Sequence, residues 1–180
     1  MAEIKSSIEL AMEKTRGLHF SREEKEKLQE EELYSKAHNL VNRFLEVDFH
    51  LKEAEKELAK HDPRQREKLE KLMFQYLIEA IQLDRDNDLI FQGIESFQGK
   101  SKRFIKEIQE LIEGYRKREQ KEYQKTGGDL LRKLERQGIS GSAVQPKIEG
   151  SREWEEATAK FRPPFEAQLL ALKKKLGSIQ

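Results

Sequence analysis

The chain has 180 residues, and its 35 basic and 34 acidic side chains leave almost no net charge. Net charge therefore gives no reason to expect a strongly cationic or anionic partner. Charged residues make up 38% of the chain, well above the roughly 25% of ordinary globular domains, and glycine and proline are few. This composition disfavours a turn-rich β protein and favours long amphipathic helices with large solvated faces.

The sequence contains no cysteine, which excludes disulfide bonds and thiolate zinc sites. Its first residues include acids at positions 3 and 9 and no continuous apolar core, unlike a secretory signal. The most apolar window, residues 72–83, is much shorter than the roughly 20 residues needed to cross a bilayer. We therefore expect a cytoplasmic protein without a membrane span.

The first third of the chain predicts a short helix followed by a long one. Residues 3–15 have the pattern of a short amphipathic helix. Ser21 and Glu24 have the spacing of a capping box, so a second helix is expected from residue 21 to about residue 60. At about 1.5 Å per residue, this helix would be on the order of 60 Å long, which predicts an elongated molecule. Its apolar residues alternate four and three apart, as in a coiled-coil seam: Leu33, Ala37, Leu40, Phe44, Val47, Leu51, Ala54 and Leu58.

A third helix is predicted from residue 63, because Asp62 can cap its first turn and Pro63 suits the first helical position. Toward its end, at residues 72–83, this helix is apolar almost all round, so one neighbouring helix cannot cover it. We expect this segment to form the centre of the core or a subunit interface. The residues expected to mediate self-association or partner binding are Leu33, Leu40, Phe44, Val47, Leu51, Leu58, Phe74, Ile78 and Trp154.

Residues 84–95 interrupt the helical pattern and have the outline of a calcium-binding loop. The carboxylates at the EF-hand ligand positions would be Asp84, Asp86, Asp88 and Glu95. The sixth position is Leu89, where the sharp turn of an EF-hand requires glycine. We therefore prefer a polar break that caps the next helix, and keep a calcium-responsive sensor as an alternative.

A fourth helix is expected to reach residue 125, to be kinked or unwound near residues 93–99, and to stop at the Thr-Gly-Gly of residues 126–128. Charge is uneven, because residues 1–63 hold 11 basic and 15 acidic side chains whereas residues 100–136 hold 12 and 7. Binding of a nucleic-acid backbone by this basic region is a second alternative. Acids interleaved at helical spacing favour a solvated, salt-bridged face instead.

The C-terminal third predicts a smaller helical unit. A short helix ends at Gly138, and residues 138–150 have the composition of an irregular loop, where we place partner specificity. A helix that starts at Ser151 is expected to break at Pro163 and Pro164 and to be followed by a last amphipathic helix. The expected parts of the chain are residues 1–20, 21–125 and 126–180.

No recognisable catalytic or cofactor-binding motif is present. Residues 93–101 imitate a phosphate-binding loop but have five residues between the glycines where that motif has four. The four histidines match none of the common metal-binding motifs, and no nucleophile motif of the Gly-x-Ser-x-Gly type occurs. We therefore expect a protein that is not an enzyme and has no cofactor.

These patterns predict an all-α fold: an elongated antiparallel helical hairpin or bundle with coiled-coil-like packing and a small C-terminal helical cap with one irregular loop. In outline, long paired helices followed by a small terminal unit resemble the GrpE-type nucleotide-exchange co-chaperones. This chain is predicted to end in helix rather than in a β-domain, so no residue roles are carried over. The expected function is that of a scaffold or chaperone-like assembly protein, a homo-oligomer that also binds a protein partner.

Overall fold

The computed structural model describes residues 21–46 and 51–179, and over these residues the fold is all-α. The short helix expected over residues 3–15 lies outside the described residues. The elements are α2 (Arg22–Leu45), α3 (Leu51–Leu58), α4 (Pro63–Ala80), α5 (Asp88–Phe97), a 3-10 turn (Gly99–Ser101), α6 (Lys102–Arg136) and α7 (Arg152–Gly177). None of the described helices is long and apolar enough to cross a membrane.

Two helix starts follow the local chemistry that the sequence predicts. The Ser21 hydroxyl accepts from the Glu24 amide while the Glu24 carboxylate accepts from the Ser21 amide, which completes the capping box of α2. At α4, the Asp62 carboxylate accepts from the amides of Arg64 and Gln65, and Pro63 occupies the first turn. Both predicted caps are confirmed.

The prediction of one continuous helix from residue 21 to about residue 60 is wrong. Helix α2 ends at Leu45, Glu46 has an extended backbone, and a separate helix α3 begins at Leu51. At 24 residues, α2 is about 36 Å long rather than about 60 Å. The break lets α3 turn back so that Ala54 and Leu58 are buried with the rest of the core, which a straight rod would not allow.

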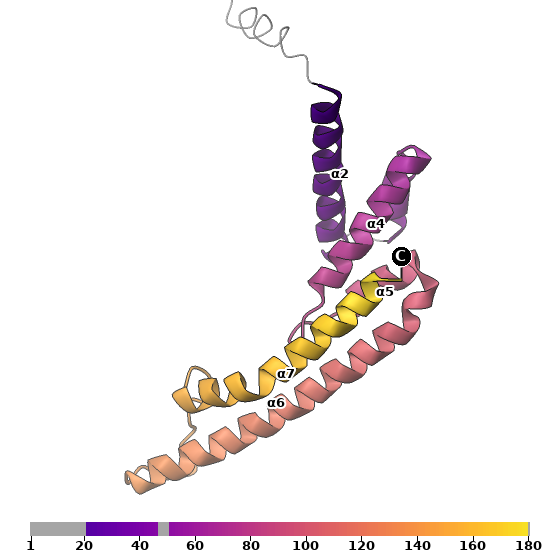
Figure 1. The fold of residues 1–180 in the computed structure, drawn as a ribbon. Coiled ribbons are helices and arrows are strands. Elements are labelled where there is room, and N and C mark those ends of the chain that lie inside the picture. The colour runs from indigo at the N-terminus through magenta and orange to yellow at the C-terminus, as the bar shows by residue number, and fades with distance from the viewer. Residues whose placement is uncertain (1–20, 47–50, 180) are drawn as a thin grey trace, which may run out of the picture.

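The core is built where α2, α4 and α5 meet. Because α3 carries the chain back, α2 and α4 run in the same direction, with their C-terminal halves in contact (Figure 1). Helix α5 packs closely against both: a Cβ added to Gly93 would lie 2.8 Å from Phe44 Cε1 and 3.0 Å from Leu77 Cδ1. The buried residues of this junction include Ala37, Leu40, Val41, Phe44, Leu69, Met73, Leu77, Ile90 and Ile94.

Helices α6 and α7 form a long antiparallel hairpin that extends away from this junction (Figure 1). As predicted, the chain unwinds before α6, because Gln98 is extended and Gly99–Ser101 forms a 3-10 turn. The expected stop at residues 126–128 is wrong, since α6 runs unbroken to Arg136. Gly127 serves close packing instead: a Cβ there would lie 2.8 Å from Ile148 Cδ1, so its small size lets the 139–150 loop fold onto α6.

The expected break at Pro163 and Pro164 is also wrong, because both prolines lie inside α7. An internal proline costs a helix about 3 kcal/mol, so packing has to offset this cost. The rings of Phe161 and Phe165 lie on either side of the two prolines, with centroids 5.9 Å and 5.6 Å from that of Tyr115 on α6. Helix α7 bends along its course in Figure 1, as internal prolines favour.

Candidate protein-binding groove

The residues predicted to form an interface are largely covered by the same chain. Buried side chains are found at Leu33, Leu40, Phe44, Leu58, Phe74 and Ile78. Trp154 is half-buried, with its ring near those of Tyr123 and Phe161 on the α6–α7 hairpin. Val47 and the side chain of Leu51 lie outside the described part of the structure. The described seam thus closes within one chain, and its role in self-association stays a prediction.

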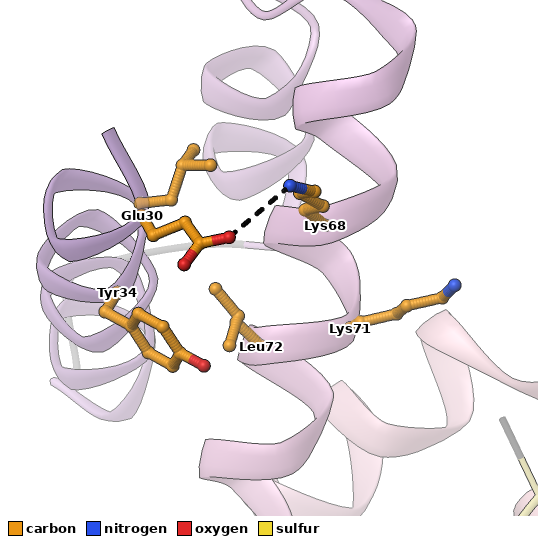
Figure 2. A pocket seen from close by; sticks show the side chains of 6 residues that line it. Glu30, Tyr34, Lys68, Lys71 and Leu72 are labelled. Carbon is orange, nitrogen blue, oxygen red and sulfur yellow. Dashed lines mark ion pairs between the residues drawn. The ribbon is translucent and has the colours of Figure 1, made fainter. Parts of the chain in front are cut away.

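A groove opens between α2 and α4 at the N-terminal end of this seam, beside Leu33. Its cavity of about 250 Å³ is lined by Glu30, Leu33, Tyr34, Lys68, Lys71 and Leu72 (Figure 2). Leu33 is the N-terminal apolar residue on the core-facing side of α2. One turn before it in the chain, the same side carries Glu30. With a carboxylate opposite the Lys68 ammonium instead of two apolar side chains, the helices have no apolar contact to hold them together there. The groove is a direct consequence of this change in pattern.

The floor of the groove is apolar, and its edge is charged. Glu30 and Lys68 approach each other across the opening, with Oε1 and Nζ 3.9 Å apart and both side chains mostly exposed (Figure 2). An exposed pair at this distance contributes little to stability, so a partner can replace it at small cost. Lys71 pairs with Glu67 on α4 at 2.8 Å, and the hydrogen bond from its ammonium lowers the pKa of the Glu67 carboxyl.

Tyr34 is the most distinctive side chain of the groove. Its ring stands at the edge beside Leu72, and 51% of the residue's surface is exposed (Figure 2). Exposed tyrosines beside a small apolar floor are typical of protein interfaces, where the ring supplies contact area at low conformational cost. An apolar side chain of a partner can pack on Leu33 and Leu72. Charged groups of either sign on the partner can meet Glu30 or Lys68 at the edge of the groove.

The predicted calcium ligands do not converge. Asp84 Oδ2 lies 3.2 Å from Arg162 Nη2 on α7, and Asp86 Oδ1 accepts from the amide of Asp88, the first residue of α5. Glu95 is exposed on α5. Across the described residues, no three His, Asp or Glu side chains gather closely enough to hold a metal ion. The segment is the polar break that the sequence favours, but the N-cap residue of α5 is Asn87, and its side chain makes no capping hydrogen bond.

Asn87 organises this break, a role that no sequence pattern predicted. Its side chain is 3% exposed, donates to the carbonyls of Gln82 and Arg85 at 2.8 and 2.9 Å, and accepts from the Gln82 amide at 3.1 Å. Arg116 on α6 also donates to the Arg85 carbonyl, at 3.2 Å. The break thereby fixes the α4–α5 junction to the α6–α7 hairpin. Only the run of aspartates around Asn87 marked the segment as polar.

The basic region of residues 100–136 has the interleaved charges expected of a solvated face. Its i,i+4 ion pairs join Arg103 to Glu107, Lys106 to Glu110, Lys117 to Glu113 and Arg118 to Glu122. These pairs neutralise much of the positive charge that a phosphate backbone would need. Nucleic-acid binding gains no support from this arrangement.

Comparisons with protein-family models, with curated proteins and with solved structures gave no significant match for this chain.

Proposed function

We propose that the protein is a non-catalytic helical assembly module that associates with a second copy of itself through the α2–α4 groove. The observation that carries the proposal is the open apolar floor between Leu33 and Leu72 with the exposed Tyr34 at its edge. A cytoplasmic location and binding of a further protein partner are parts of the same proposal. A chain without cysteine needs no oxidising compartment for its folding.

A second copy is the occupant that the groove's chemistry favours. Most soluble oligomers are two-fold symmetric, so one patch has to be complementary to itself. The groove meets this condition, because Tyr34 can fill the partner's apolar floor while forming a wall of its own. It also carries both signs of charge, with Glu30 on α2 and Lys68 on α4, so a two-fold rotation can place acid against base.

Sedimentation velocity over a range of protein concentrations tests this proposal. The wild type is expected to shift from monomer to dimer as concentration rises. Tyr34→Lys should raise the dimer dissociation constant by about tenfold or more, since tenfold corresponds to about 1.4 kcal/mol of lost interface energy. The matched control is Leu89→Lys, which changes an apolar residue of similar exposure (43%) on α5, away from the groove.

Circular dichroism would verify that both variants keep the wild-type helix content. A wild type that remains monomeric at every concentration up to the solubility limit contradicts the proposal. Equal effects of Tyr34→Lys and Leu89→Lys would also contradict it, because the dimer would then not use the groove.

A further inference from the structure

A second cavity lies between α4 and α7, separate from the α2–α4 groove. Its volume is about 520 Å³, within the roughly 300–1,000 Å³ range of small-molecule sites. One side is apolar, formed by Phe74 and Ile78 of α4 and by Leu170 of α7. Leu170 is 55% exposed, whereas Phe74 and Ile78 are almost fully buried, at 1% and 6%. Leu170 therefore supplies most of the apolar surface that the chain leaves uncovered at this cavity.

Two ammonium groups lie at the same cavity. Lys173 and Lys174 line it from α7, and in the described part of the chain neither forms an ion pair. Lys173 is half-buried, and its Nζ donates to the backbone carbonyl of Glu79 at 3.0 Å. The Glu79 carboxylate accepts instead from the Gln75 amide at 3.2 Å. Within the described residues no carboxylate lies at ion-pair distance from the Lys173 ammonium, although Glu79 also lines the cavity and its charge partly supports the ammonium.

Such a cation gains from an anionic ligand. Burial lowers the pKa of Lys173 below its ordinary value, because the charged form loses solvation, and the negative charge of Glu79 only partly opposes this effect. A carboxylate brought to this ammonium would form a charge-assisted hydrogen bond in a partly water-excluded position, where such bonds are strongest. An uncharged apolar molecule of the same shape would bring no negative charge to the Lys173 ammonium.

We propose that the α4–α7 cavity binds a small amphipathic carboxylate, with its alkyl body against Leu170, on the side that Phe74 and Ile78 also line, and its carboxylate at Lys173 and Lys174. Medium-chain fatty acids have this chemistry. The site is distinct from the proposed dimer groove and does not depend on self-association.

Isothermal titration calorimetry with dodecanoate below its micelle concentration tests the proposal. Dodecanol and dodecyltrimethylammonium serve as probes with the same alkyl chain but no charge or the opposite charge. The wild type should bind dodecanoate at least tenfold more tightly than either. Lys173→Met, which keeps the length of the side chain but removes its charge, should weaken dodecanoate binding by tenfold or more. The matched control is Lys175→Met, which removes an exposed charge outside the cavity.

Two further variants keep the test informative if Lys173→Met does not fold. Lys174→Met and Leu170→Glu both alter exposed positions, and each should weaken binding of dodecanoate. Absence of dodecanoate binding, equal binding of dodecanoate and dodecanol, or full binding by Leu170→Glu would each overturn the assignment.

Discussion

Gly93 offers a sharp test of how the three helices at the core pack. Alanine at this position would place its Cβ 2.8 Å from Phe44 Cε1 and 3.0 Å from Leu77 Cδ1, both in buried side chains. Real Cβ atoms do not tolerate 2.8 Å, so the buried side chains of Phe44 and Leu77, or α5 itself, would have to shift. Overpacking of this kind costs about 1–3 kcal/mol. The change also removes a helical glycine, which returns about 1 kcal/mol.

The control for this prediction is Gly114→Ala on α6. Its Cβ would meet only Phe165 Cε1, at an ordinary contact distance of 3.7 Å, so the helix-propensity gain of about 1 kcal/mol should appear as added stability. That gain is shared by both variants and cancels in their difference. The difference in unfolding free energy between Gly93→Ala and Gly114→Ala should therefore equal the overpacking cost, about 1–3 kcal/mol.

Urea denaturation followed by circular dichroism at 222 nm would measure both variants beside the wild type, with equal slopes required for the comparison. If Gly93→Ala is as stable as Gly114→Ala, then α5 does not pack against Phe44 and Leu77, and the described core junction is incorrect.

Three further predictions concern the break before α5 and the α6–α7 hairpin. Asn87→Ala should lower the unfolding free energy by about 1–3 kcal/mol in urea denaturation, because buried backbone groups lose their partner; a neutral result would exclude its bridging role. Gly128→Ala should raise the melting temperature, since its Cβ has room, whereas Gly127→Ala should gain less because it meets Ile148; equal gains would mean that the loop does not pack there. Burial and the hydrogen bond to Glu119 raise the pKa of Tyr115 to about 12, so the folded state keeps a proton that the unfolded state releases above about pH 10. Stability should accordingly fall between about pH 10 and 12, and less steeply in Tyr115→Phe; parallel curves for the two proteins would contradict this assignment.

The features that the sequence predicted correctly are those set by local chemistry. The capping box at Ser21 and Glu24 and the Asp62–Pro63 start depend on residues within one turn, and both form as expected. The apolar pattern of Leu33 to Phe44 identified the core-facing side of α2, because burial follows helical periodicity. The helical class of the fold follows from the same patterns.

The errors arose where distant parts of the chain decide the local structure. Gly127 is a helix-breaking residue by propensity, but Ile148 from the following loop uses the space that it leaves. Pro163 and Pro164 stay helical because α6 supports the helix on either side of them. The groove was not predicted for a related reason. The sequence shows that the apolar stripe of α2 begins at Leu33, but it does not show that α4 lies opposite and also stops making apolar contacts there.

Single-cysteine cross-linking tests the proposed groove-to-groove association most directly, because the chain has no cysteine of its own. Lys71→Cys, at a groove-lining position that leaves Tyr34 in place, and Leu89→Cys would each be treated with a short bismaleimide linker, and dimers would be counted after denaturing electrophoresis. Rapid cross-linking at position 71, with little at position 89, is the expected result. Equal yields at the two positions would show that the copies do not associate through the α2–α4 groove, which would contradict the proposal.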